Sequence, residues 1–339
     1  MTLTLLAGES RPTQRMLSET RALVEPAHRA AVDRLPAPMR HIVGYHVGWW
    51  DAEGLPSDAA GKAVRPALVI AAARAVGADP GCAVPEAVAV ELVHDFSLLH
   101  DDVMDGDLTR RHRPSAWALF GVGEAILAGD MLVSLACDLL AGRPGLSTLT
   151  GAVLDLCAGQ AADLAFEQRA QVSVEECLAM AAGKTGALLA CACRLGALAG
   201  GADEARARAL TEFGRHLGLA FQLVDDLLGI WGDPETTGKP AGTDLARRKK
   251  SLPVVAALSS GTPAANRLAR LYGRADDGDP ASLALLADLV EDAGGRAWAQ
   301  AEADRRMQAA MDCLTQGVGE GPGSSGLADL AAMITRRDR

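Results

Sequence analysis

The chain has 339 residues, 49% of them hydrophobic and 4% aromatic, with a formal net charge of −10 and a pI near 5.2. This apolar content is enough for a large core in one domain, and the acidic balance argues against nucleic acid as a partner, because phosphate binding needs a basic face. Alanine- and leucine-rich sequence with few alternating β-branched runs predicts an all-α fold.

The predicted elements begin after an N-terminal stretch that mixes Ser, Pro, Thr and Gly. Residues 1–15 are expected to form a mobile tail, so that the folded domain comprises residues 16–339, and helical periodicity starts near Ser18. A loop at 51–61 then opens onto the first of several long apolar helices. These helices are expected at residues 64–77, 85–105, 115–142, 146–170, 173–200 and 205–231.

Three stretches in the C-terminal third interrupt this helical pattern. Residues 233–250 are polar and rich in Gly and Pro, and we expect them to form a functional flap after the preceding helix ends. Loop-like sequence at 274–280 and 315–326 separates the last helices without marking a domain boundary.

The cysteines and the apolar segments bear on the compartment. Seven cysteines, an odd number, are scattered through apolar helical stretches, which is typical of a reduced, cytoplasmic protein. The run Leu3 to Leu6 is too short for a signal peptide and has no basic residue before it. No apolar stretch reaches the length needed to span a membrane, so we expect a cytoplasmic protein with no membrane span.

Two clusters of adjacent aspartates lie inside strongly apolar segments. The first contains Asp101, Asp102 and Asp105, and the second contains Asp225 and Asp226. On a helix, spacings of three and four residues bring Asp105 onto one face with both Asp101 and Asp102. A solvated helix face is the alternative interpretation, but carboxylates in apolar surroundings need cations or basic groups beside them. Hard oxygen ligands of this kind suit Mg²⁺ bound together with substrate phosphates.

Basic residues that can balance these carboxylates occur in short, separated groups. Arg110 and Arg111 follow Asp105 by about one and a half helical turns, which puts them within reach of a polyphosphate bound at the first cluster. Lys62 and Arg65 lie at a predicted helix start, where the backbone dipole favours an anion. Singly, each is more often an exposed surface charge. With Lys184, Lys239 and Lys249 they predict two anion sites bridged by divalent metals.

These motifs follow one another in the order of the polyprenyl diphosphate synthase family, which the chain resembles over nearly its whole length. Residues 61–66, Gly-Lys-Ala-Val-Arg-Pro, resemble the family's GKRxRP with Ala63 in place of the first arginine, and residues 101–105 match its DDxxD motif. Further matches in family order are Arg110-Arg111, Gly129-Asp130, Gly159-Gln160 with Asp163, Lys184-Thr185, Phe221-Gln222, and Gly238-Lys239-Pro240 with Asp244, Lys249 and Pro253. The resemblance implies a single antiparallel helical bundle of the isoprenoid synthase type with a central active-site cavity.

The resemblance also implies a reaction and a set of residues for it. The reaction is a Mg²⁺-dependent head-to-tail condensation of isopentenyl diphosphate with allylic diphosphates, in which about three metal ions act. Metal ligands would be Asp101, Asp105 and Asp225, and isopentenyl diphosphate would be bound by Lys62, Arg65, His94 and Arg111. The allylic diphosphate would be bound by Arg110, Lys184, Thr185, Gln222, Lys239 and Lys249. The residues of the chemical step would be Asp101, Asp102, Asp105, Arg110, Lys184, Asp225 and Lys239.

The second aspartate cluster departs from the family pattern. Gly229 takes the place of the third aspartate, and the next acid is Asp233, which precedes a proline and is expected to serve the flap. Because Asp225 corresponds to the family's main metal ligand in this motif, we expect activity. Two alternatives stay open: a non-catalytic subunit of a heteromeric synthase, and a class I terpene cyclase, which would have no use for Lys62 and Arg65.

Product length depends in this family on side chains below the first motif. Phe96 lies five residues before Asp101, and the small Ser97 lies four before it. One aromatic at the fifth position resembles synthases that stop at C20, so geranylgeranyl diphosphate is the expected product. A farnesyl or longer-chain product is the alternative, with Phe96 then an ordinary core residue.

Partners are also implied by the resemblance. A homodimer is usual in the family. Residues 44–51, Gly-Tyr-His-Val-Gly-Trp-Trp-Asp, resemble an actinobacterial branch, some members of which travel inside encapsulin shells behind a long N-terminus. Because the preceding tail is short, we do not expect encapsulation. The aromatic side chains of this segment are expected to pack between helices, the alternative being an exposed interface.

Overall fold

The computed structural model describes residues 11–57, 59–233, 242–273, 279–319 and 321–335. Within them the chain is almost entirely helical, as expected, and the only sheet is a hairpin of β1 (Thr109–Arg110) and β2 (Arg113–Pro114). The N-terminal helices are α1 (Arg11–Val32), α2 (Ala37–Val47), α3 (Val64–Ala75), η1 (Pro80–Ala83), α4 (Val84–Met104), α5 (Ala116–Phe120) and α6 (Val122–Leu139). The middle of the chain forms α7 (Leu146–Glu167), α8 (Val174–Ala181), η2 (Ala182–Gly186), α9 (Ala187–Ala199) and α10 (Glu204–Trp231). The C-terminal part contains α12 (Thr243–Ala246), α13 (Leu252–Leu258), α14 (Pro263–Tyr272), α15 (Pro280–Asp292), α16 (Gly295–Val318) and α17 (Pro322–Thr335).

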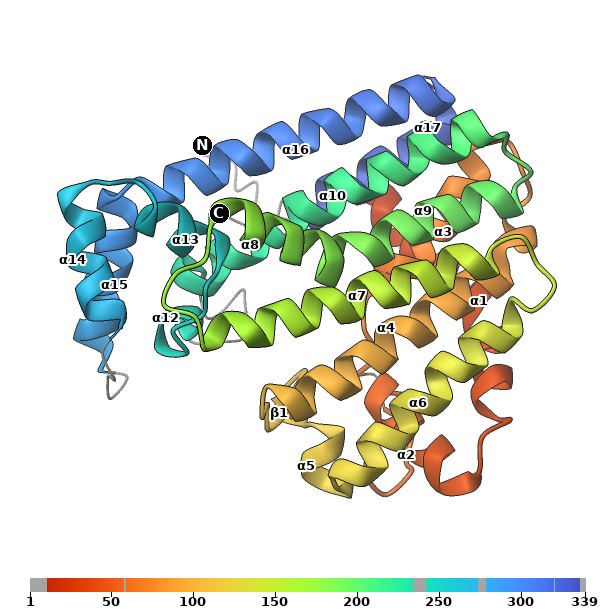
Figure 1. The fold of residues 1–339 in the computed structure, drawn as a ribbon. Coiled ribbons are helices and arrows are strands. Elements are labelled where there is room, and N and C mark those ends of the chain that lie inside the picture. Colours follow the sequence, from red (N-terminus) through yellow and green to blue (C-terminus); the bar gives the residue numbers. More distant parts are fainter. Residues whose placement is uncertain (1–10, 58, 234–241, 274–278, 320, 336–339) are drawn as a thin grey trace, which may run out of the picture.

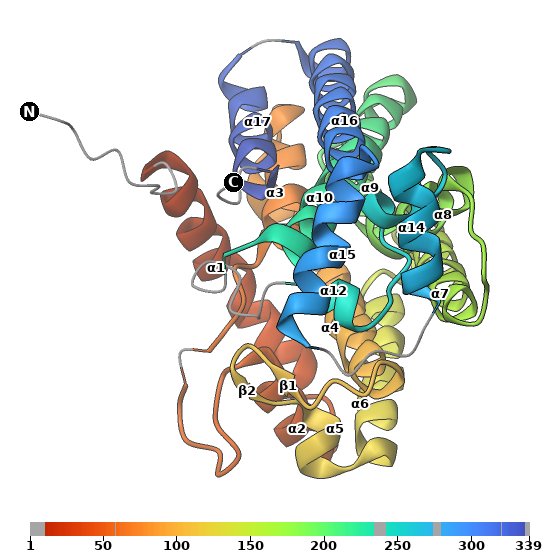
Figure 2. The same cartoon turned by 90° about the vertical axis from the view of Figure 1, so that its left-hand side faces the viewer.

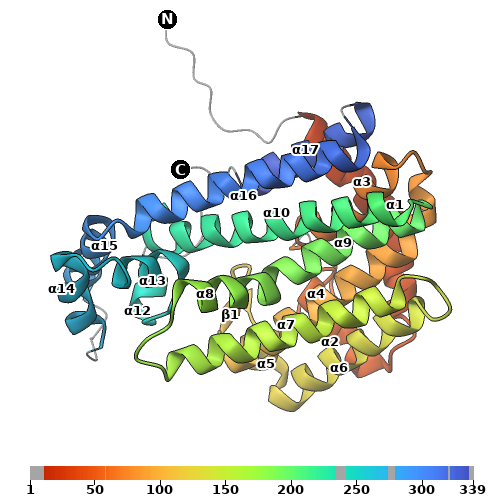
Figure 3. The ribbon, with the colours of Figure 1, turned by 45° about the horizontal axis from the view of Figure 1, so that its top comes forward.

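The long helices lie side by side in a layered bundle. Figure 1 shows α16, α10, α9, α7 and α4 one below another, with α6 and α2 below α4, and in Figure 3 α4 lies behind α9 and α7. The short helices α12 to α15 gather at one end of the bundle, where α10 also ends. Short turns join α9 to α10 and α6 to α7, which makes these neighbours antiparallel. Figure 2 shows the hairpin beside α2 and α5.

A continuous apolar core fixes the two helices that carry the aspartates. Helix α3 is buried from Pro66 to Ala73, so it is apolar all round and packs between α4 and α9. Side chains of α4 and α10 such as Leu92, Leu99, Leu210 and Leu217 have almost no exposed surface. Because core packing in proteins is dense, this arrangement sets the rotation of α4 and α10 about their axes.

Several predicted boundaries differ from the structure. The first helix begins at Arg11, so residues 11–15 are helical and not part of a tail; residues 1–10 lie outside the described part. The helix expected at 115–142 is broken at Gly121, whose φ of +112° is a conformation that favours glycine. The expected loop at 315–326 is mostly helical: α16 continues to Val318 because it packs along α10.

Two helices also correct the expectation about membrane length. By length and composition, α7 and the continuous stretch Val174–Ala199 are long and apolar enough to cross a membrane. In this fold both belong to the bundle, and the second is more than half buried within it. The same apolar pattern serves helix packing inside a bundle, so length alone does not separate the two cases.

Candidate active site

A cavity of about 1990 Å³ opens between α4 and α10 and collects most of the predicted site residues. Asp101 of α4 and Asp105, directly after the end of α4, line it on one side, and Asp225 lines it from α10. Nine residues predicted to bind the substrates also line it: Lys62, Arg65, His94, Arg110, Arg111, Lys184, Thr185, Gln222 and Lys249. Lys239, together with residues 234–241 of the expected flap, lies outside the described residues.

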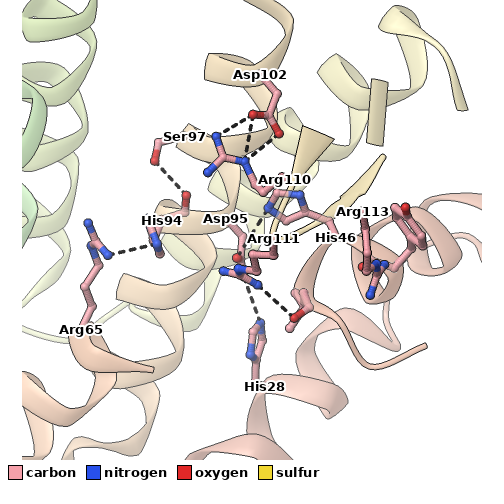
Figure 4. Close-up of polar contacts among 12 residues, drawn as sticks. His28, His46, Arg65, His94, Asp95, Ser97, Asp102, Arg110, Arg111 and Arg113 are labelled. Carbon is pink, nitrogen blue, oxygen red and sulfur yellow. Dashed lines mark hydrogen bonds and ion pairs between the residues drawn. The ribbon is translucent and has the colours of Figure 1, made fainter. Parts of the chain in front are cut away.

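Asp102 does not share the face of Asp101 and Asp105, contrary to expectation. Its side chain is 1% exposed and receives the guanidinium of Arg110, with Nε 2.8 Å from both carboxylate oxygens and Nη2 2.5 Å from Oδ1 (Figure 4). Such a bidentate, charge-assisted contact fixes the arginine's plane. Asp102 therefore orients Arg110 at the cavity wall.

Half-buried Asp101 and exposed Asp105 remain as the candidate ligands of the first cluster. Burial, opposed by Lys184, raises the pKa of Asp101 to about 6 in the metal-free protein. A carboxyl group with a raised pKa gains most from a nearby cation, because a cation favours the charged form. A divalent ion bound beside Asp101 would therefore lower this pKa and favour the charged carboxylate.

Arg110 and Arg111 reach the cavity from the hairpin, not from a continued helix. Helix α4 ends at Met104, and the chain turns back through Arg111 and His112 between β1 and β2. Arg111 Nη1 donates to the carbonyl oxygen of Val47 at 3.2 Å, and its guanidinium lies against Gly61, next to Lys62. The hairpin therefore brings Arg111 to the start of α3.

Arg65 and His94 form a pair at this same end of the cavity (Figure 4). Arg65 Nη1 lies 3.0 Å from Nε2 of His94, and since a guanidinium only donates, the ring nitrogen accepts. Burial, and then Arg65, hold the pKa of His94 well below its usual range. The pair presents positive charge from Arg65 next to a neutral imidazole.

Lys184 lies in η2, a π-helical turn of the kind that often occurs at functional sites. Its Nζ donates to Oδ2 of Asp163 on α7 at 2.7 Å. The approach of the two helices requires Gly159, because a Cβ there would lie 2.2 Å from the backbone nitrogen of Lys184. The bulge and this glycine together turn the ammonium group towards the cavity.

A chain of hydrogen bonds runs inward from the second cluster. Thr185 Oγ1 donates to Gln222 Oε1 at 2.6 Å, and Gln222 Nε2 donates to Asp226 Oδ1 at 2.8 Å. The other oxygen of Asp226 accepts from the backbone nitrogen of Leu252 at 2.9 Å, and its side chain is buried. Asp226 thus ties α10 to α13, while Asp225 points outward, which parallels the division between Asp102 and Asp101.

The carboxylate of Asp244 occupies the space beside Gly229. A Cβ at position 229 would lie 2.5 Å from Oδ2 and 2.8 Å from Cγ of Asp244, which comes from α12. Lys249 is the shared counter-charge here: burial alone would lower its pKa, but Asp226 and Asp244 outweigh burial and raise it. An acidic side chain from elsewhere in the chain therefore lies where the motif itself has none.

These donors fit Mg²⁺. Within the described residues, no group of three or more His, Cys, Asp or Glu side chains comes together as a closed metal site. The carboxylates of Asp101, Asp105 and Asp225 instead line an open cavity together with cationic side chains. That arrangement suits an ion that keeps waters and shares its ligands with substrate phosphates.

The two residues expected to control product length face different ways. Ser97 lines the cavity beneath Asp101 and donates its hydroxyl to the carbonyl oxygen of His94 at 2.8 Å. Phe96 turns towards α6, with its ring centroid 4.8 Å from that of His100, and is not among the described residues that line the cavity.

Other lining residues were not predicted as site residues. Asp163 pairs with Lys184, Asp244 adjoins Gly229, and Arg247 forms an ion pair with Asp107 across the cavity mouth. The basic run at 247–250 in the sequence was the available signal for Arg247 and Arg248.

Carboxylates and basic side chains thus meet across one cavity of an all-α bundle, which suits an enzyme that holds a diphosphate substrate through metal ions. Residues 56–289 match the model of the polyprenyl synthetase family, and the chain belongs to that family of prenyltransferases.

Named relatives agree with this assignment. The chain is 48% identical to "(2E,6E)-farnesyl diphosphate synthase" of Mycobacterium tuberculosis over 97% of this chain and 94% of the relative. It is equally, 48%, identical to "Geranylgeranyl diphosphate synthase" of the same organism over 95% and 93%. The crystal structure of a polyprenyl synthetase from Streptomyces coelicolor superposes with a TM-score of 0.90 at 49% identity, covering 94% of this chain and 98% of that one.

Proposed function

We propose that this prenyltransferase condenses isopentenyl diphosphate with allylic diphosphates and stops at geranylgeranyl diphosphate. The observation that carries the condensation is the distribution of charge in one cavity. Lys62, Arg65 and Arg111 gather at one end, while Lys184 and Lys249 lie with the aspartates at the other. Two separate basic groups suit two diphosphates, whereas a terpene cyclase binds one.

The end formed by Asp101, Asp105 and Asp225 would hold the allylic diphosphate through about three Mg²⁺ ions, with Lys184, Lys249 and Arg110 on the remaining oxygens. Lys239 is proposed for the same role from the sequence motif alone. Bound there, the metal would neutralise charge on the departing diphosphate. Asp102 keeps Arg110 in its plane through the bidentate contact. The hydrogen bonds of Thr185 and Gln222 keep Asp226 and α13 in register with the site.

The other end would hold isopentenyl diphosphate on Lys62, Arg65, His94 and Arg111. The allylic C1–O bond breaks and its electron pair leaves with diphosphate. The double bond of isopentenyl diphosphate supplies the electrons of the new C–C bond to C1. The released diphosphate then takes a proton from C2 of the isopentenyl unit, and the electrons of that C–H bond form a new double bond. The protein contributes position and electrostatic stabilisation, not a nucleophile.

The C20 product rests on Ser97, a small residue that leaves the cavity open beneath Asp101. The relatives do not decide between C15 and C20, because farnesyl and geranylgeranyl synthases are equally similar. Phe96 does not line the cavity, so it would limit the tail from behind the lining, through its packing against Gly129 of α6. Its replacement by alanine should therefore lengthen the product, and unchanged C20 output would remove Phe96 from this role.

The decisive experiment uses the purified chain with Mg²⁺, labelled isopentenyl diphosphate and each allylic diphosphate in turn, followed by measurement of product length. A linear product that depends on isopentenyl diphosphate supports the proposal, and C20 supports its finer part. No prenyl product with any starter would overturn it and favour the non-catalytic subunit. Cyclic product without isopentenyl diphosphate would instead indicate a terpene cyclase.

We also propose a cytoplasmic homodimer. All seven cysteines are free thiols in the structure, which suits a reducing compartment. Exposed apolar side chains gather on α5 to α7, namely Leu119, Val122, Ile126, Leu127 and Leu154. Apolar surface of this kind favours burial against a second subunit. Sedimentation of the wild type as a dimer, and of Leu127→Glu as a monomer, is the expected result; a monomeric wild type would refute it.

A further inference from the structure

The turn that presents Arg111 is strained. Arg111 has φ of +51° and His112 has φ of +61°, so both central residues of a two-residue hairpin are left-handed. Such turns prefer Asn-Gly, because a Cβ makes the left-handed region unfavourable. Neither residue here is Gly or Asn. A backbone held in this state needs support from its surroundings, and strain of this kind collects at functional sites.

The support comes from the last turn of α2. Arg113 Nη2 donates to the carbonyl oxygen of Tyr45 at 2.8 Å, and the Tyr45 hydroxyl donates to the carbonyl oxygen of Pro114 at 2.8 Å. The Arg113 guanidinium lies 4.1 Å from the Tyr45 ring centroid. Val47 accepts from Arg111. Carbonyl groups at a helix C-terminus carry the negative end of the dipole, so they attract both guanidinium groups.

The same turn of α2 lies beside the helix that carries the first aspartate cluster. His46 Nε2 lies 3.7 Å from Oδ1 of Asp95 on α4, and His28 Nε2 from α1 lies 3.9 Å from Oδ2 of the same carboxylate (Figure 4). All three side chains are buried. The end of α2 is therefore buried beside the part of α4 that carries His94.

We propose that Tyr45 is a positioning residue, which clamps the strained hairpin onto α2 so that Arg111 is held ready for the isopentenyl diphosphate end of the cavity. This inference rests on the proposed function, in which Arg111 binds that substrate. It gives the Gly-Tyr-His-Val-Gly-Trp-Trp segment a role in substrate binding beyond packing. Packing alone would need only the ring of Tyr45, which contacts Phe120 edge-on at 5.3 Å.

The test is Tyr45→Phe, which keeps the ring and removes the hydroxyl that holds Pro114. The chain offers a matched control in Tyr272, its other tyrosine, whose hydroxyl donates to the carbonyl oxygen of Lys249 at 2.7 Å at the opposite end of the cavity. Loss of one hydrogen bond corresponds to about a three- to tenfold effect. Tyr45→Phe should raise KM for isopentenyl diphosphate by that factor and leave KM for the allylic substrate unchanged. Tyr272→Phe should show the reverse.

A second measurement separates the clamp from the reaction. Hydrogen–deuterium exchange of residues 108–116 in the ligand-free protein should be faster in Tyr45→Phe than in wild type, and unchanged in Tyr272→Phe. If the wild type shows no turnover but hairpin exchange is still faster in Tyr45→Phe, the proposed function is refuted and the clamp remains supported. Unchanged exchange, or an equal rise of both KM values together with a lower Tm, would overturn the clamp itself.

Discussion

Replacing Gly229 by aspartate would complete the DDxxD sequence of the second aspartate cluster, yet the structure predicts that this substitution destabilises the protein. A glycine inside a helix normally costs about 0.5–1 kcal/mol relative to alanine, so a substitution there should help. Here the new Cβ would lie 2.5 Å from Oδ2 of Asp244 and must displace that carboxylate. Gly229→Ala should therefore lose the usual gain and lower the free energy of unfolding by about 1 kcal/mol.

Aspartate adds a like charge to this steric conflict. Two carboxylates about 4 Å apart repel by about 4 kcal/mol at an effective dielectric constant of 20, and part of this is relieved by rotation of the new side chain. We expect Gly229→Asp to lower the free energy of unfolding by about 3 kcal/mol in total. Turnover should not rise, because displacing Asp244 also disturbs Lys249, the ammonium group that balances both Asp244 and Asp226.

The assay is urea unfolding in the presence of EDTA, for Gly229→Ala, Gly229→Asp and Gly229→Asp with Asp244→Asn. The second substitution keeps the shape of Asp244 and removes its charge, so it should recover the charge part of the loss, about 2 kcal/mol. If Gly229→Asp is as stable as Gly229→Ala without metal, or if Asp244→Asn recovers nothing, the carboxylate of Asp244 does not occupy this space.

Three further predictions concern the first cluster. Burial raises the pKa of Asp101 to about 6, and Mg²⁺ binds only the charged carboxylate, so protons compete with Mg²⁺ below that pH. The rise in Tm that Mg²⁺ produces at pH 8 should therefore shrink as the pH falls through 6. A rise that stays constant would contradict this. Asp102→Asn should lower the free energy of unfolding by about 3 kcal/mol in urea, since Arg110 loses its buried counter-charge; an unchanged midpoint would count against it. Ser97→Phe should shorten the main product to C15 by chromatography, and C20 output would show that Ser97 does not border the tail.

Much of the site could be predicted because its signals are local. Adjacent aspartates inside apolar sequence are costly without partners, and this alone indicated a cation site at each of the two aspartate clusters. Basic groups at Lys62, Arg65 and Lys184 follow from order along the chain, and the structure places all three in the same cavity. The all-α class followed from composition and periodicity, which depend on neighbouring residues only.

Helix ends were less accurate where long-range packing decides them. Helix α16 continues past Thr315 because it lies along α10, although its Gly and polar residues would end an isolated helix. The segment around Arg110 was expected to lie between two helices, but the hairpin itself was not predicted, because its left-handed turn contains no Gly or Asn and so leaves no sequence signal.

The sequence by itself determined which residues are chemically suited to the site: carboxylates for a hard cation, and arginines and lysines for diphosphates. Only the tertiary structure decided which member of each aspartate pair faces the cavity. Asp101 and Asp225 face it, whereas Asp102 and Asp226 point inward to Arg110 and to the backbone of Leu252. Neighbouring residues on a helix differ by about 100° in direction, so the rotation of α4 and α10 in the core assigns their roles, and core packing sets that rotation.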